Sequence, residues 1–223
     1  MGLYPPDFVA QLKARNIAWF ANVTTVAEAR EAEAAGADVV VAQGMEAGGH
    51  RGAFDQAVAE RDAVGLFALL PAVVDAVKLP VVATGGIADA RGVAAALILG
   101  ASAVQIGTAL LRCPEANLPA GWADALAHTP PEGTIVSRVF SGRAGRSIAT
   151  DYARAATTPD APAPRPVPGA ARPHPTDARR PAAKAGDGTR MQAWAGQSAA
   201  MARAVPAEQL VRELWDGARA LLR

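Results

Sequence analysis

The spacing of apolar residues along the chain predicts strands that alternate with helices. Near-continuous apolar runs of strand length occur at residues 17–23, 38–43, 79–84 and 103–106. Runs of this kind are typical of strands buried on both faces of a parallel sheet. Ala-rich stretches of helical length separate them. The order strand, helix, strand, helix, strand, helix, strand therefore predicts an α/β fold with a parallel sheet and right-handed crossovers.

Local signals mark the ends of the predicted helices. Thr25 and Glu28 have the spacing of a capping box, with Thr25 at the N-cap and Glu28 reaching back. Gly36 is placed to end that helix at the position after its C-cap. A second helix is expected over about 66–77, and Asp89 is expected to cap a third that ends at Gly100.

The predicted domains are a barrel segment, an irregular segment and a helical end. Residues 1–156 carry the four strands, and no strand signal follows residue 106. Eight prolines between Pro159 and Pro181 predict irregular chain over 157–190. Residues 191–223 are predicted to pack on the barrel, through a helix that begins near Pro206 with Leu210, Leu214, Ala218 and Leu221 along one face. Because a TIM barrel needs eight strands, four predict a half barrel.

Composition and charge narrow the functional classes. Hydrophobic residues make up 51% and charged residues 19%, and the net charge is +1, which gives no reason to expect nucleic acid or an anionic membrane as partner. Cys113 is the only cysteine, so an internal disulfide is excluded, and we expect it to be a structural thiol. Without a leader sequence or an apolar run of membrane-spanning length, the expected location is the cytoplasm.

Three strand ends carry the candidate chemistry. After the second strand, Gln43 offers both a hydrogen-bond donor and an acceptor, and Gly48 and Gly49 allow close backbone approach, which suits a flat heterocycle or simply a tight structural loop. The next two strand ends are Ala83-Thr-Gly-Gly-Ile87 and Gln105-Ile-Gly-Thr108. Glycine-bearing strand ends at these places in a barrel commonly bind phosphate.

The stretches AQGMEAGGHRG, LPVVATGGIADARGVAAALILGASAVQIGTALLRCPEA and VFSGRAGR resemble motifs of the nitronate monooxygenase (2-nitropropane dioxygenase) family, as do the later WAGQSAAMAR and PAEQLV. The resemblance implies an FMN-dependent TIM barrel without a metal, whose partners are a nitronate and O₂ and whose products are a carbonyl compound and nitrite. It implies that this chain holds the C-terminal strands 5–8. The implied FMN contacts are Gln43, Gly48, Gly49, Gly85, Gly86, Gln105, Ile106, Gly107 and Thr108.

The resemblance also implies a missing part. The family's proposed catalytic histidine would precede Gly2, so we expect it to be absent together with the N-terminal half of the barrel. His50 is a weak candidate to replace it, and the alternative is that His50 only shapes its loop. His128 and His174 are expected to be exposed. Glu46 and Arg51 are expected to form a loop ion pair or to orient substrate.

Ser141 and Arg143 are further candidate site residues, and two alternative functions stay open. Ser141 and Arg143 are expected to close the site or to bind on its phosphate side. The EAGGH loop is shared with flavin-barrel enoyl-acyl-carrier-protein reductases, although Gln43 and Arg51 favour the monooxygenase. A non-catalytic remnant is the other alternative: it would at most bind flavin, and unpaired sheet edges would favour self-association.

Overall fold

The computed structural model describes residues 2–162 and 192–223, and its backbone contacts divide the chain into two compact units. The first, called the sheet unit here, comprises Met1–Ala47, Arg51–Ile106 and Trp215–Arg223. The second, called the hairpin unit, comprises Gly48–His50 and Gly107–Leu214. The predicted domain boundaries at 156 and 190 stay a prediction, and residues 163–191 of the proline-rich segment lie outside the described residues.

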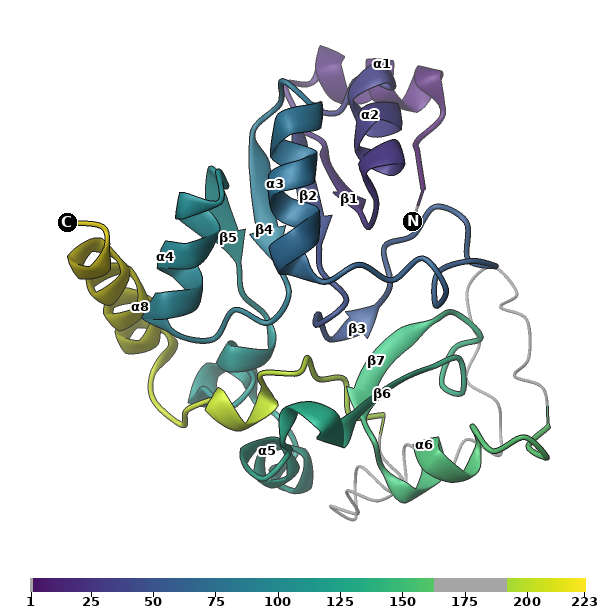
Figure 1. The fold of residues 1–223 in the computed structure, drawn as a ribbon, viewed down its shortest axis with the longest axis vertical. Helices are drawn as coiled ribbons and strands as arrows, with labels where there is room; N and C mark the ends of the chain where they lie inside the picture. Colours follow the sequence, from purple (N-terminus) through teal and green to yellow (C-terminus); the bar gives the residue numbers. More distant parts are fainter. Residues whose placement is uncertain (1, 163–191) are drawn as a thin grey trace. The chain divides into compact units, whose positions relative to one another are not determined.

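The sheet unit is built on a four-stranded parallel sheet of order β1-β2-β4-β5 (Figure 1). Its strands are β1 (Phe20–Val23), β2 (Val39–Gln43), β4 (Val81–Thr84) and β5 (Ala103–Gln105). All four coincide with the apolar runs of the sequence. The first begins three residues later than expected, at Phe20. The parallel α/β class predicted from the alternation is therefore confirmed, and every neighbouring pair is parallel.

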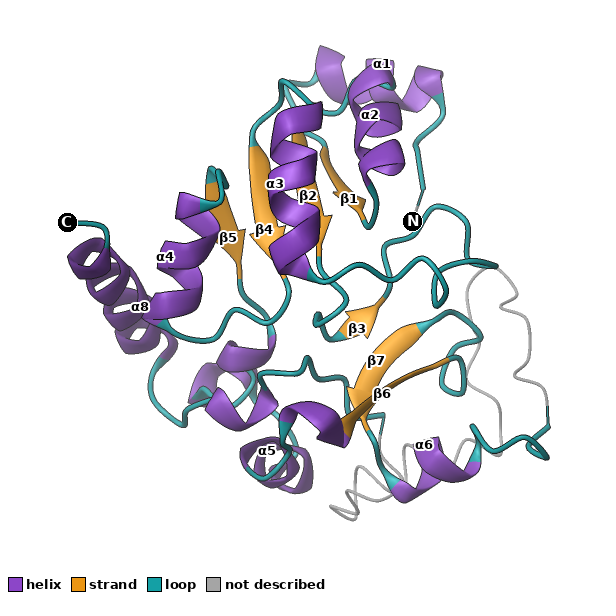
Figure 2. Ribbon diagram, in the orientation of Figure 1, coloured by secondary structure: helices purple, strands orange, loops and turns teal. Residues whose placement is uncertain are grey.

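Helices connect these strands and cover one face of the sheet (Figure 2). They are α2 (Val26–Ala34), α3 (Leu66–Ala76) and α4 (Ala90–Ile98), which agree closely with the predicted ranges. The largest fully buried apolar side chains of the unit come from α3, β1 and β2: Leu69, Leu70, Val73, Val23 and Val40. The hydrophobic effect of burying these side chains holds the layers together.

The predicted caps are present, with one difference. The Thr25 hydroxyl accepts from the Glu28 N–H at 3.2 Å, and Asp89 accepts from the Gly92 N–H at 2.9 Å. The Glu28 carboxylate does not return to Thr25. It accepts from the N–H and the hydroxyl of Thr24, at 2.6 and 2.9 Å, and from the N–H of Phe54 at 2.6 Å. Glu28 thus ties the end of β1 to the long loop that follows β2.

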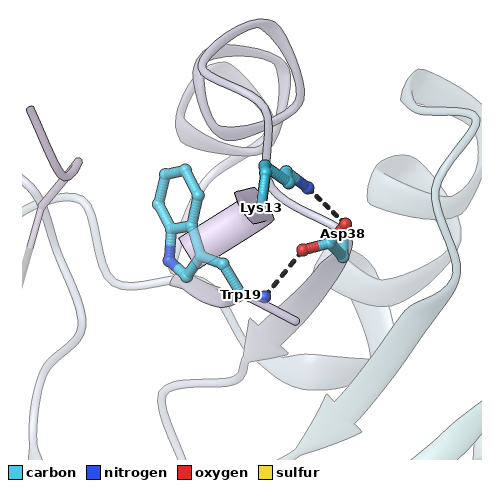
Figure 3. A network of polar contacts seen from close by, with 3 residues as sticks. All are labelled: Lys13, Trp19 and Asp38. Carbon is cyan, nitrogen blue, oxygen red and sulfur yellow. Dashed lines mark hydrogen bonds and ion pairs between the residues drawn. The ribbon is translucent and has the colours of Figure 1, made fainter. Parts of the chain in front are cut away.

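A helix that the sequence pattern did not predict, α1 (Pro6–Ala14), precedes β1. An ion pair joins Lys13 to Asp38, and the second Asp38 oxygen accepts from the Trp19 N–H at 2.7 Å (Figure 3). Lys13 and the Trp19 N–H together lower the pKa of Asp38. Both contacts favour the ionised carboxylate. Through them, Asp38 connects α1 and the entry to β1 with the start of β2.

The C-terminal helix is α8 (Ala207–Leu221). Three of its four predicted core positions are buried, namely Leu210, Leu214 and Ala218, whereas Leu221 is 57% exposed, so the predicted apolar face is one turn too long. Within the sheet unit, Gly217 lies against α4. A Cβ atom added to Gly217 would stand 2.7 Å from the Ala90 Cβ.

The hairpin unit contains a second sheet, which corrects the expectation that no strand follows residue 106. Its order is β3-β7-β6, all antiparallel, with β3 (Gly49–His50), β6 (Thr134–Ser137) and β7 (Gly145–Ile148). These strands are short, and β7 buries polar side chains, so they lack an apolar run. The backbone of residues 193–195 extends this sheet, with a bridge between Ser147 and Trp194.

Short helices complete the hairpin unit. They are η1 (Thr108–Leu110), η2 (Pro114–Ala116), α5 (Ala120–Ala127), η3 (Pro131–Gly133), α6 (Asp151–Ala155) and η4 (Ala199–Met201). A small core joins Leu126 and Ile148 to Ala193, Ala195 and Ala199. Among residues 2–162 and 192–223, none of the helices combines the length and apolar character needed to cross a membrane.

Candidate functional site

The carboxyl ends of β2, β4 and β5 bring the three predicted site segments of the sheet unit to one edge. Gln43 pairs in register with Thr84, and Thr84 pairs in register with Gln105. The Thr84 hydroxyl donates to the Gln105 carbonyl at 2.9 Å. Gly85, Gly86 and Ile106 follow directly in the chain. In parallel α/β sheets this edge is where ligands bind.

Gly85 and Gly86 turn the chain sharply away from β4. Their φ angles are +118° and +70°, a region that L side chains rarely adopt. A Cβ atom at Gly85 would stand 3.2 Å from both the Ala47 nitrogen and the Gly44 oxygen. The backbone of the loop after β2 therefore approaches Gly85 closely. Only glycine meets both conditions without strain.

Gln43 braces the loop that follows its strand. Its side chain is 6% exposed, and its Oε1 accepts from the Gly52 N–H at 2.8 Å. The amide thus connects two ends of the glycine-rich stretch, a role that the sequence did not reveal. That Gln43 also contacts FMN stays a prediction.

Glu46 and Arg51 bond to the backbone, and the ion pair expected between them is not seen among the described residues. The Glu46 carboxylate accepts from the Leu66 N–H at 2.9 and 3.0 Å, where α3 begins. Arg51 is 1% exposed and donates to the carbonyls of Gly44 and Gln43, at 2.7 and 3.2 Å. Both side chains therefore shape the loop after β2.

In the hairpin unit, the backbone around Gly48 and Gly49 is packed on one side and open on the other. A Cβ atom at Gly48 would stand 2.5 Å from the Ala195 carbonyl carbon and from the Gly196 nitrogen. At Gly49 it would meet nothing within 4 Å. Gly48 thus permits a close backbone approach, as its loop position suggested. The group that approaches it is the backbone of residues 195–196.

His50 is held by contacts from distant parts of the chain. Its Nε2 lies 2.6 Å from the Ser141 Oγ, and its ring centroid lies 4.9 Å from that of Trp194. Burial lowers the pKa of His50, and the nearby charge of Arg143 lowers it further, so the imidazole is neutral at pH 7. Sequence analysis named Ser141 and Arg143 but missed Trp194, whose only signal was the WAGQ stretch.

Thr108 is occupied by an internal contact. Its Oγ1 accepts from the Gly196 N–H at 2.9 Å, and Thr108 begins the single 3-10 turn η1. A Cβ atom at Gly107 would meet nothing within 4 Å. The backbone at Gly107 is therefore open, whereas the Thr108 hydroxyl anchors residue 196.

The remaining sequence candidates have structural or surface positions. Cys113 is 3% exposed, and burial raises the pKa of its thiol, with Glu115 adding to the shift, which confirms a structural thiol. His128 is exposed, as expected. His174 lies outside the described residues. In the part of the chain that the structure describes, no group of three or more His, Cys, Asp or Glu is placed to hold a metal ion.

Comparison with known proteins gives consistent matches. The sequence model of the family described as "Nitronate monooxygenase" matches residues 1–217. The chain is 42% identical to a nitronate monooxygenase of Paraburkholderia phytofirmans, over 96% of this chain and 58% of that protein. It is 43% identical to a nitronate monooxygenase of Pseudomonas aeruginosa, over 98% of this chain and 62% of that protein. The chain thus spans about three fifths of the length of these relatives.

Solved structures agree with these relatives. A nitroalkane oxidase from Streptomyces ansochromogenes is similar with a TM-score of 0.87 and 39% identity, covering 99% of this chain and 64% of that one. FabK from Thermotoga maritima is similar with a TM-score of 0.77 and 29% identity, covering 98% of this chain and 66% of that one. The alignments cover nearly all of this chain and do not show that an N-terminal half is missing.

Proposed function

The chain belongs to the nitronate monooxygenase family, and on this premise we propose that it binds FMN and takes part in the oxidation of alkyl nitronates by O₂ to a carbonyl compound and nitrite. It spans 58% and 62% of two curated relatives, so this activity is a proposal for the protein as a whole. The barrel arrangement and self-association through sheet edges stay predictions.

The observation that carries the proposal is the carboxyl edge of the parallel sheet. Gln43, Thr84 and Gln105 stand in register there, and two glycines with positive φ follow the central strand. A turn of two glycines has no side chains to keep an anion away from the backbone, which suits a phosphate. The residues therefore fit the anionic tail of FMN.

The proposed cofactor contacts are those implied by the family motifs. Gln43, Gly85, Gly86, Gln105 and Ile106 belong to the sheet edge, and Gly48, Gly49, Gly107 and Thr108 are predicted contacts on the adjoining chain. FMN, when bound, supplies the capacity to accept electrons from the nitronate and pass them to O₂. The protein's part is to bind and orient cofactor and substrate and to limit their contact with water.

The proposed reaction needs no base to remove a proton from carbon when the substrate is already a nitronate. A nitronate is the deprotonated form of a nitroalkane, so no C–H proton has to be removed. His50, with a pKa lowered by burial, is neutral and able to accept a proton at pH 7, which keeps it a candidate base for nitroalkanes. The preformed nitronate is therefore the appropriate first substrate for a test.

The experiment begins with the full chain mixed with FMN and then desalted. We expect a flavin absorption spectrum to remain with the protein, and oxygen uptake and nitrite release to start when propyl-2-nitronate is added. In a parallel arm, NAD(P)H and an enoyl thioester test the rival activity inferred from the EAGGH loop. Enoyl reduction without nitronate-dependent oxygen uptake would reverse the assignment.

Two further outcomes separate binding from catalysis. Retained flavin without either turnover would support the alternative of a non-catalytic flavin-binding chain. A folded protein that keeps no FMN after desalting contradicts the proposed role of the sheet edge. Arg212→Gln on the exposed surface of α8 serves as a control variant, because the hydrogen bonds of the Arg212 side chain among the described residues go to Glu208, one turn away.

A further inference from the structure

The β6–β7 hairpin carries a concentrated positive charge. From Thr134 to Thr150 the sequence contains three arginines and no acidic residue. Two of these arginines have hydrogen bonds within the hairpin: Arg138 donates to the Gly142 carbonyl at 3.4 Å, and Arg146 donates to the Thr134 hydroxyl at 2.9 Å. The third, Arg143, differs from both.

The Arg143 guanidinium has no acidic partner and no side-chain hydrogen bond among the described residues, and its Nε is buried without an acceptor. A buried donor that has lost its water and gained no acceptor is costly, and native proteins leave few of them. A ligand that supplies an acceptor would remove that cost. Arg143 is therefore a binding candidate that internal packing does not explain.

The position of Arg143 links it to His50. Its backbone N–H donates to the Ser141 Oγ at 3.4 Å, and the same oxygen lies 2.6 Å from His50 Nε2. In the β3–β7 ladder, His50 pairs with Gly145, two residues after Arg143. The charge of Arg143 also acts on the imidazole, because it contributes to the lowered pKa of His50. Arg143 and His50 therefore belong to one small cluster built on this hairpin.

Aromatic rings flank the cluster. The Trp194 ring centroid lies 4.9 Å from that of His50 and 5.4 Å from that of Phe140. Rings displace water and lower the local dielectric constant, which strengthens the attraction between a guanidinium and an anion. The lowered pKa of His50 agrees with this environment and leaves Arg143 as the charged member of the pair at pH 7.

We propose that Arg143, with His50 beside it, binds the planar two-oxygen anionic group of the substrate, the nitronate in the reaction proposed above. A guanidinium presents its N–H groups as a flat fork that matches two oxygens on one atom. Carboxylates share this geometry and are ligands of the same kind. The inference rests on the proposed function for the name of the substrate, and on the hairpin geometry for the anion site.

Propionate, which has the same planar two-oxygen end and does not react, tests the site without turnover. In the full chain, the His50 ring proton signal is followed by NMR while propionate is added, with a His50→Gln variant for assignment among the three histidines. We expect a saturable shift. Arg143→Gln should weaken the binding about 10- to 100-fold, the loss expected for hydrogen bonds to a charged group.

Matched variants separate charge from folding. Arg143→Lys should retain part of the affinity, and Arg212→Gln should bind propionate as the parent does. Circular dichroism establishes that each variant is folded. With FMN and propyl-2-nitronate, Arg143→Gln should raise KM by a similar factor and leave kcat nearly unchanged, because Arg143 holds the substrate and performs no chemical step.

The outcomes distinguish this inference from the proposed function. Unchanged propionate affinity and KM in folded Arg143→Gln would overturn the anion site while nitronate oxidation stands. Propionate binding that depends on Arg143, without nitronate oxidation in the parent, would support the anion site and reject the reaction. If Arg143→Gln lost FMN but kept riboflavin, the guanidinium would serve the cofactor phosphate, and the inference would be wrong.

Discussion

Replacing Gly85 by alanine tests how the sheet edge is built. Gly85 has a φ of +118°, and holding an L residue in such a sparsely populated region costs about 1–3 kcal/mol. The new Cβ would also press on the Ala47 nitrogen and the Gly44 oxygen, both at 3.2 Å and both backbone atoms. The lower entropy of the unfolded alanine chain returns only about 0.4–1 kcal/mol. We therefore expect Gly85→Ala to lower the free energy of unfolding by about 1–3 kcal/mol.

Gly92→Ala is the matched control within the same unit. Gly92 lies in the first turn of α4, and its nearest neighbour, the Ile87 Cγ2, would be an ordinary 3.4 Å from the added Cβ. Alanine there should stabilise the protein by about 0.5–1 kcal/mol, because glycine is a poor helix former. The two substitutions are chemically identical and are predicted to have opposite signs.

Urea denaturation followed by circular dichroism measures both effects. The midpoint should fall for Gly85→Ala and rise for Gly92→Ala, with equal slopes showing that the unfolding reaction is unchanged. Flavin retention after desalting should fall in Gly85→Ala alone. If Gly85→Ala proved as stable as Gly92→Ala, the strained turn and the close approach of the loop after β2 would both be refuted.

Three other predictions follow from single contacts. Glu46→Ala should lower the free energy of unfolding by about 0.5–2 kcal/mol, as for a lost helix cap, and Glu46→Gln by less, as measured by urea denaturation; equal stability of all three proteins would exclude the cap. Gly217→Leu should lower the thermal midpoint, with an expected cost of about 1–3 kcal/mol, because its Cβ would strike Ala90, and an unchanged midpoint would contradict that packing. NMR titration should place the pKa of His50 below its ordinary value, because burial and then the charge of Arg143 lower it, and Arg143→Gln should raise it. The free energy of unfolding that is linked to His50 should be fully present above the pKa of His50 in the unfolded chain, and it should be lost as pH falls through the lower pKa of the folded protein. A titration midpoint at or above the ordinary histidine value would disprove this.

Elements with local signals were predictable from the sequence. The buried strands β2 and β4 are continuous apolar runs, and the Thr25 and Asp89 caps are set within three residues of the helix start. Helix α1 was missed because Val9 is its only buried residue, so it has no apolar stripe. Strand β7 was missed because it buries polar side chains such as Ser147, whose burial depends on pairing with distant chain.

The same division applies to the candidate site. The common position of Gln43, Thr84 and Gln105 at one sheet edge was predictable, since parallel strands bring their carboxyl ends together. The second glycine pair, Gly48 and Gly49, belongs to the hairpin unit instead. The contacts that fix the loops are not local: Gln43 meets Gly52, 9 residues away, and His50 meets Ser141, 91 residues away. The residue types alone suggested an ion pair for Arg51, whereas the fold uses it to hold backbone carbonyls.

The burial of Cys113 gives the hairpin unit a natural chemical reporter. It is the sole thiol in the sequence, it is almost fully shielded, and its raised pKa keeps it protonated and unreactive. An added disulfide reagent can therefore modify it only when the surrounding structure opens. The rate of modification, followed across a urea series without introducing any label, measures how often this unit opens.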